Sequence, residues 1–128
     1  MRKYVFKRAN SFVYAFKGIF SLIGTQPNAV IHLFATVIVV SFGFYFKLKN
    51  WEWCAIIICI ALVWIAEALN TAIEFVVNLV SPEYHPLAGK AKDVAAASVL
   101  LAAFFAVIVG LIIFGPRFLA VSGISFPI

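Results

Sequence analysis

Three long apolar stretches limit what this chain can fold into. One runs from Ala29 to Phe46, the second begins at Trp51–Trp53, and the third runs from Val94 to about Phe114. Each has, or nearly has, the roughly 20 residues that a helix needs to cross a hydrocarbon core about 30 Å thick. Because 65% of the 128 residues are hydrophobic, a soluble fold of this length would have too little interior to hide them. The sequence therefore predicts an all-α integral membrane protein.

We expect a single membrane-embedded domain over residues 1–128, with transmembrane helices at 28–46, 51–79 and 94–115. The segment 81–93, SPEYHPLAGKAKD, holds two prolines and a glycine. These residues favour a turn over a helix interior, so the whole segment is expected to link the second and third membrane helices as a turn.

The first 24 residues have a different pattern. Apolar side chains recur there at steps of three and four, and basic side chains interrupt them as far as Lys17. A basic, aromatic-rich helix of this kind tends to lie in the membrane surface, so residues 1–24 are expected to form an amphipathic surface helix. The basic residues leave no uninterrupted apolar core, which argues against a signal peptide.

The distribution of lysine and arginine predicts the orientation in the membrane. Five of these residues lie in the N-terminal segment and two in the segment 81–93, whereas three lie on the opposite side. Because cytoplasmic loops carry the excess of basic residues, the N-terminus and the segment 81–93 are expected in the cytoplasm. The formal net charge of +5 does not indicate a nucleic-acid partner, since the sequence has neither an aromatic–basic platform nor a helix-turn-helix pattern.

Two carboxylates follow the most apolar run of the chain. Trp53–Ala66 spans only about 21 Å as a helix, so the helix has to continue further to finish crossing the membrane. An ionised side chain within the membrane costs on the order of 3 kcal/mol, so acidic residues in this extension are functional candidates. At about 100° per residue, five polar side chains share one face of the extension: Glu67, Asn70, Thr71, Glu74 and Asn78.

The spacing of this polar face leaves several chemistries open. Hydrogen bonding between packed helices is one, and an ion or proton pathway is another. A Mg²⁺ and phosphate site is a third, because Mg²⁺ prefers oxygen ligands. His32 and His85 are not expected to bind a metal, since no second histidine or cysteine stands at ligand spacing.

Small residues recur at every fourth position of the third apolar stretch. This spacing lets helices approach closely, either within one protomer or between protomers. Three membrane helices enclose very little by themselves, so a homo-oligomer is expected. The small residues are Ser98, Ala102, Ala106 and Gly110.

The segment EALNTAIEFVVNLVSPEYHPLAGKAKD, Glu67 to Asp93, resembles the signature of small bacterial membrane-integrated lipid kinases, the prokaryotic diacylglycerol kinases and undecaprenol kinases. The likeness combines the Glu–x–x–Asn–x–x–x–Glu helix, the Glu–Tyr–His turn and the following Ala–Lys–Asp. It extends over nearly the whole chain, through SFVYAFKGI near the N-terminus and NAVIH at the start of the first membrane helix. Pro-Leu-Ala after His85 is closer to the undecaprenol kinase branch.

The resemblance implies a homotrimer of three-helix protomers in the bacterial inner membrane, with active sites shared between neighbouring subunits. It also implies ATP- and Mg²⁺-dependent phosphorylation of a membrane lipid alcohol, undecaprenol or diacylglycerol, at the cytoplasmic face. By this likeness Glu67 takes the proton from the lipid hydroxyl, Asn70 orients the reacting groups, and Val99 belongs to the substrate site. Glu74 and Gln26 occupy the metal-ligand positions. The nucleotide-binding positions are Lys7, Phe12, Lys17, Gly18, Glu74, Lys92 and Asp93.

Two positions depart from the family pattern. Gln26 stands where the family usually has a carboxylate, and Asn78 stands where it usually has an aspartate. An amide oxygen still coordinates Mg²⁺, but two lost charges weaken the attraction for a dication. The alternative hypothesis is therefore a catalytically weakened or inactive family member that binds lipid or nucleotide without turnover.

Overall fold

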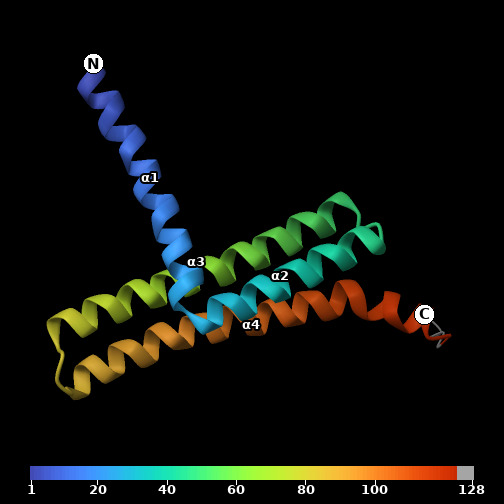
Figure 1. The fold of residues 1–128 in the computed structure, drawn as a ribbon. Coiled ribbons are helices and arrows are strands. Elements are labelled where there is room, and N and C mark those ends of the chain that lie inside the picture. Colours follow the sequence, from blue (N-terminus) through green and yellow to red (C-terminus); the bar gives the residue numbers. More distant parts are fainter. Residues whose placement is uncertain (124–128) are drawn as a thin grey trace.

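The computed structural model describes residues 1–123, apart from the side chains of Arg2 and Lys3, and helices are its regular elements over that range. They are α1 (Arg2–Thr25), α2 (Pro27–Tyr45), α3 (Asn50–Val80) and α4 (Pro86–Val121). Figure 1 shows α2, α3 and α4 side by side, with α3 antiparallel to the other two, whereas α1 leaves this bundle at a steep angle. The chain turns from α1 into α2 at a single residue, Gln26.

The three long helices confirm the predicted all-α membrane architecture. Each of α2, α3 and α4 is long and apolar enough to cross a membrane. The observed ends of α1, α2 and α3 lie one residue from the predicted bounds of 1–24, 28–46 and 51–79. The placement of α1 in the membrane surface, the orientation and the homotrimer stay predictions.

The prediction of a turn over residues 81–93 is wrong for its second half, because α4 begins at Pro86. A proline at the first helical position costs nothing, since the N–H that it lacks has no partner inside a helix. His85 caps the helix, with its Nδ1 accepting a hydrogen bond from the backbone N–H of Leu87 at 3.1 Å. Lys92 and Asp93 consequently lie on α4 rather than in a loop. The same helix continues past the predicted end at 115 to Val121.

The bundle packs most tightly where the α2–α3 turn meets the C-terminal end of α4. Leu48, Ile56, Ile113 and Phe114 form a buried cluster there. Phe42 near the end of α2 and Phe46 just after it meet two phenylalanine rings of α4 at centroid distances of 5.0–6.4 Å. Burial of these apolar side chains holds the start of α3 against the end of α4.

An ion pair between a buried carboxylate and a half-buried guanidinium closes the same end of the bundle. Glu52 is 5% exposed, and its Oε2 accepts hydrogen bonds from Arg117 Nη2 and from the backbone N–H of Lys49, each at 2.8 Å. The guanidinium also donates to the carbonyl oxygen of Ile113. Both charges are therefore satisfied within the bundle, as a buried pair requires.

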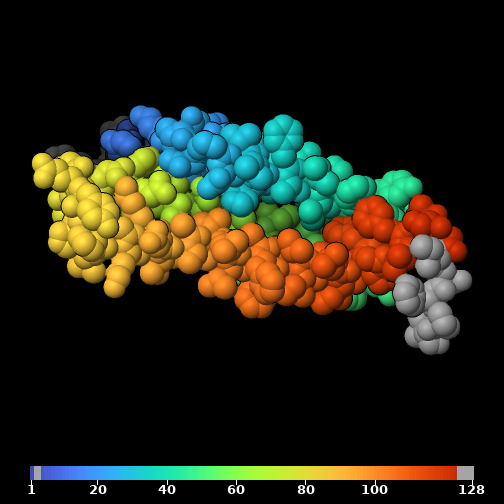
Figure 2. All heavy atoms as spheres, turned by 90° about the horizontal axis from the view of Figure 1, so that it is seen from below, coloured from blue at the N-terminus to red at the C-terminus, as the bar shows by residue number. Residues whose placement is uncertain are grey.

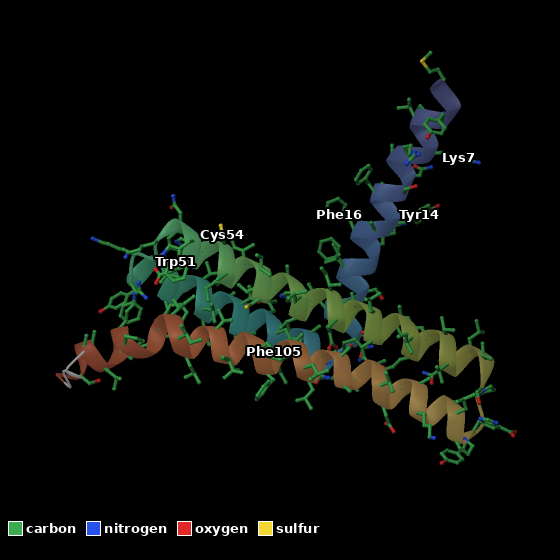
Figure 3. All side chains as sticks on the ribbon, turned by 180° about the vertical axis from the view of Figure 1, so that it is seen from behind. Lys7, Tyr14, Phe16, Trp51, Cys54 and Phe105 are labelled. Atoms are coloured by element: carbon green, nitrogen blue, oxygen red, sulfur yellow. The ribbon has the colours of Figure 1, made fainter. Side chains whose placement is uncertain are left out.

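Most large apolar side chains outside this cluster are exposed, as expected for helices that face lipid. Figure 3 shows Lys7, Tyr14 and Phe16 on the projecting helix α1, away from the long helices. Trp51 lies at the opposite end of α3 from the α3–α4 turn, and it is 63% exposed. An exposed tryptophan at a helix end is typical of a membrane interface.

We expect Arg117→Ala to destabilise the protein by about 3 kcal/mol, because the buried Glu52 carboxylate loses its cationic partner. Thermal unfolding of the purified protein in detergent, followed by circular dichroism, measures the fall in the midpoint. The double variant Glu52→Gln/Arg117→Met is the control. It should unfold near the wild-type midpoint, since no charge is left buried without a partner. An unchanged midpoint in Arg117→Ala contradicts the expectation.

Candidate functional site

The polar face predicted on the second membrane helix lies on α3, and its burial is graded along the helix. Glu67 is 0% exposed, Asn70 5% and Thr71 4%. Glu74 is half-buried and Asn78 is exposed. The Asn70 side-chain amide donates a hydrogen bond to Glu74 Oε1 at 3.4 Å. The face therefore runs from a sealed carboxylate within the bundle to an open end near the α3–α4 turn.

The Glu67 carboxylate lies among polar atoms that form no hydrogen bond with it. Its Oε2 is 3.6 Å from His32 Nε2 of α2. Neither oxygen of Glu67 has a hydrogen-bond partner among the described residues, and the same holds for His32 Nε2, Asn70 Oδ1 and Thr71 Oγ1. Because buried polar atoms are nearly always paired in folded proteins, such a cluster marks a candidate site for a ligand, an ion or bound water.

A hollow of about 260 Å³ opens beside this cluster between α2, α3 and α4. His32 and Asn70, the polar neighbours of Glu67, form part of its wall, together with Asn28 and Val99. On the face of the molecule that Figure 2 shows, atoms of α3 are visible at the bottom of a recess between α2 and α4. Val99, which the resemblance places in the substrate site, thus shares a hollow with Asn70.

Gln26 lies level with Glu74 along the bundle. The contact between His32 and Glu67 fixes the relative height of α2 and α3. Antiparallel helices rise equally per residue in opposite directions, so a step back along α2 matches a step forward along α3. Gln26 stands six residues before His32, and Glu74 stands seven residues after Glu67. The two positions that the resemblance assigns to the metal therefore lie at the same height.

Lys92 contacts the open end of the polar face from α4. Its Nζ donates a hydrogen bond to Asn78 Oδ1 at 2.6 Å. Both residues line a smaller hollow of about 160 Å³, which is bordered by the α3–α4 turn with Glu83–His85. Asp93, the next residue of α4, is exposed. The fold thus brings Lys92 to the polar face and leaves Asp93 on the surface.

The α1 residues that the resemblance assigns to the nucleotide do not gather at one place within a protomer. Gly18 lines a groove between α1 and α3, beside Thr71. Lys17 contacts the ring of a tyrosine on its own helix. Lys7 lies on the projecting part of α1 in Figure 3, and Phe12 is 69% exposed. Gly18 is therefore the one of these four residues that lines a hollow with α3 in the described structure.

The polar face offers oxygen ligands for a metal ion. Among residues 1–123, no group of three or more His, Cys, Asp or Glu side chains is close enough to hold one. The oxygens on this face are the Glu74 carboxylate and the unpaired Oδ1 of Asn70, and the Gln26 amide stands at the same height on the neighbouring segment. Mg²⁺ is usually held by one or two carboxylates together with phosphate oxygens and waters. This donor set fits a Mg²⁺ ion that binds together with a phosphate ligand.

His32 is the residue of this site that sequence reasoning missed. Thirty-five positions separate it from Glu67, and no metal-ligand spacing marks it. A signal was nevertheless present, because a lone histidine near the start of an otherwise apolar membrane stretch needs a polar partner that lipid does not supply.

A family model and several known proteins match this chain. The family model described as prokaryotic diacylglycerol kinase matches residues 13–114. The undecaprenol kinase of Bacillus subtilis (strain 168) is 41% identical over 107 residues, which cover 84% of this chain and 87% of that protein. The diacylglycerol kinase of a Synechocystis species is 46% identical over 101 residues, 78% of this chain and 58% of that protein. The diacylglycerol kinase of Escherichia coli (strain K12) is 48% identical over 59 residues, 46% of this chain.

Cysteines placed along the polar face should react with a water-soluble maleimide at graded rates. In a background with Cys54 and Cys59 replaced by alanine, we expect Glu67→Cys to react at least about tenfold more slowly than Asn78→Cys. The reason is that a thiol reacts only where the reagent reaches it. Mass spectrometry of the purified protein in detergent measures the rates. Labelling in denaturant is the control that shows both thiols to be intact, and equal rates in the folded protein contradict the sealed position of Glu67.

Proposed function

The chain belongs to the prokaryotic diacylglycerol kinase family, and from this premise we propose that it transfers the γ-phosphoryl group of ATP to the hydroxyl group of a membrane lipid. The matched relatives are named as kinases of undecaprenol or of diacylglycerol, so a lipid alcohol is their shared type of acceptor. The undecaprenol kinase matches over most of both chains, and this favours a polyprenol acceptor here.

In this proposal Glu67 is the general base. Its oxygens are buried and unpaired, and the neighbouring hollow ends at His32 and Asn70. A lipid hydroxyl approaching between these two side chains gives its proton to Glu67 while its oxygen attacks the γ-phosphorus. The bond from phosphorus to the β,γ-bridging oxygen breaks, and ADP leaves with the electron pair. The unpaired buried carboxylate beside a hollow is the observation that carries the proposal.

The nucleotide phosphates would lie at the more open end of the polar face. Glu74, with the amide oxygens of Gln26 and Asn70, would hold Mg²⁺ there, and the ion supplies positive charge against the phosphate oxygens during transfer. The hydrogen bond from Asn70 to Glu74 keeps the metal-binding carboxylate at a set distance from Glu67. The Lys92 ammonium adds a second positive charge for the phosphates.

We also propose that neighbouring protomers complete each site in a homotrimer. Lys7 and Phe12 stand on the projecting and exposed part of α1, and Asp93 is exposed on α4. Placed against the α3–α4 end of an adjacent protomer, these residues would enter its nucleotide site. An inner-membrane location with the N-terminus in the cytoplasm belongs to the same proposal, because it puts α1 and the α3–α4 turn on the side that contains ATP.

Purified wild-type protein with Mg-ATP should phosphorylate undecaprenol or diacylglycerol in mixed micelles, and Glu67→Gln should lower kcat by about 10³-fold because the base is lost. Transfer of labelled phosphate into the extracted lipid measures the rate, with both lipids assayed in parallel. The double variant Glu52→Gln/Arg117→Met is the control, since it makes the same substitution in α3 at the far end of the bundle and leaves no buried charge without a partner. Failure of the wild type to label either lipid over a range of Mg²⁺ concentrations would show that the chain is not an active kinase. An equal loss in the double variant would remove the assignment of the base.

Gln26→Glu should lower the Mg²⁺ concentration needed for the half-maximal rate by about tenfold, since it adds a carboxylate level with Glu74. Asn78→Asp adds the same negative charge at a different place. The Lys92 ammonium lies 2.6 Å from the Asn78 side-chain oxygen, so it neutralises most of the added charge. Asn78→Asp should therefore change the Mg²⁺ requirement by less than about twofold. Titration of the kinase rate with Mg²⁺ at fixed ATP compares the two variants. An unchanged or greater requirement in Gln26→Glu would exclude position 26 from the metal site.

A further inference from the structure

His32 is the one basic side chain with a nitrogen within 4 Å of a Glu67 oxygen in the described structure. Its Nε2 lies 3.6 Å from Glu67 Oε2, and its side chain is 17% exposed, against 1% for Glu67. Neither of these two atoms has a hydrogen-bond partner among the described residues. His32 also lines the hollow beside the site, whereas Glu67 does not. The imidazole therefore stands between the carboxylate and the hollow, with Nε2 near the carboxylate.

A second contact between α2 and α3, one turn away, confines the imidazole. Trp64 of α3 donates its Nε1–H to Thr36 Oγ1 of α2 at 3.1 Å. Thr36 Oγ1 in turn donates to the carbonyl oxygen of His32 at 2.7 Å. The rings of Trp64 and His32 meet edge to face, with centroids 6.5 Å apart and planes at 68°. The indole thus limits the positions that the imidazole adopts beside Glu67.

We propose that His32 is a positioning residue for Glu67, an inference that rests on the proposed role of Glu67 as general base. During the reaction the imidazole closes the 3.6 Å separation and donates its Nε2–H to Glu67 Oε2, which leaves Oε1 to accept the proton of the lipid hydroxyl. As the lipid oxygen bonds to the γ-phosphorus and the bond to the bridging oxygen breaks, the proton passes to Oε1 and the electron pair leaves with ADP. His32 keeps its own proton throughout.

A buried base needs such a donor for a geometric reason. The last torsion of a glutamate side chain is broad, so a carboxylate without a donor takes several orientations. Only some of them place an oxygen where it meets the incoming hydroxyl, and small misplacements of a reacting group cost large factors in rate. In the described structure Asn70 does not supply the donor, because its amide donates to Glu74 Oε1 and makes no hydrogen bond to Glu67. His32 lies on another helix, so it fixes the carboxylate from outside α3.

The experiment compares His32→Gln, which keeps an N–H donor on a side chain of similar reach, with His32→Leu, which has no donor. Steady-state kinetics of the purified full-length variants with Mg-ATP and the lipid that the wild type uses give kcat and KM. We expect His32→Leu to lower kcat by about 10- to 100-fold with KM for ATP and lipid within about twofold, and His32→Gln to recover most of the lost kcat. His32→Met replaces His32→Leu if the leucine variant does not fold.

Ser41→Ala is the matched control, because it removes the same kind of hydroxyl-to-carbonyl hydrogen bond from an exposed part of α2 more than two turns from His32, and it should keep the wild-type kcat. Three results overturn the positioning role: wild-type kcat in His32→Leu, equal losses in both His32 variants, or an effect confined to KM. A loss in His32→Gln as complete as that in Glu67→Gln also overturns it, since His32 would then be the base itself. The kinase activity is judged separately, from the wild type and Glu67→Gln, so its failure is distinct from a failure of the role of His32.

Discussion

The structure is organised around a carboxylate enclosed by apolar helices. Lipid does not satisfy a charged side chain, and the cost of burying one within the membrane is on the order of 3 kcal/mol or more, so polar neighbours have to surround Glu67. His32 lies 3.6 Å away, and Asn70 and Thr71 follow on the same face of α3, yet none of these residues forms a hydrogen bond with it in the described structure. The bundle is held together elsewhere, by the Glu52–Arg117 pair and the buried apolar cluster at the other end of α3. The contacts that stabilise the bundle and the polar atoms of the candidate site thus lie on different parts of α3. The polar atoms of the site stay unpaired because the stability of the fold does not depend on hydrogen bonds between them.

Because the helices differ in length, α3 reaches both the hydrocarbon core of the membrane and the water beside it. α2 has 19 residues, about 28 Å, which is close to the thickness of the hydrocarbon core. α3 has 31 residues, about 46 Å, and therefore extends well past the start of α2, where Gln26 turns the chain into α1. Measured against that junction, Glu67 lies inside the layer that α2 spans, Glu74 lies at its boundary, and Asn78 lies beyond it. A reaction between a lipid in the membrane and a nucleotide in water needs this gradient, and α3 supplies it without a soluble domain.

Hydropathy, helix length and helical periodicity predict most of the fold and the part of the candidate site that lies on α3. Hydropathy and length placed α2 and α3 to within a residue, and the 100° step placed the polar face of α3. The rule that proline and glycine favour turns fails at the start of α4, because Pro86 stands at the first helical position and His85 caps the helix. The contact of His32 with Glu67 depends on how two helices lie against each other, which no periodicity within either helix contains. The surroundings of Lys7 in an assembly depend on a neighbouring chain, and the sequence of one protomer does not specify how that chain docks.

The two departures from the family's acidic pattern have opposite consequences on the proposed mechanism. Asn78 accepts a hydrogen bond from Lys92, and an amide in this place leaves the ammonium its full positive charge, where an aspartate would cancel much of it. The absence of a carboxylate at position 78 therefore strengthens the positive electrostatic potential that Lys92 provides for the nucleotide phosphates. Among the described residues, no lysine or arginine side chain donates a hydrogen bond to Gln26, whose amide nitrogen donates to the Thr25 hydroxyl at 3.4 Å. The charge missing at position 26 is lost to the metal alone, so the proposed set of metal ligands keeps one carboxylate, that of Glu74. Such a site holds Mg²⁺ chiefly through the phosphates that arrive with it, which makes the metal and the nucleotide bind as one unit.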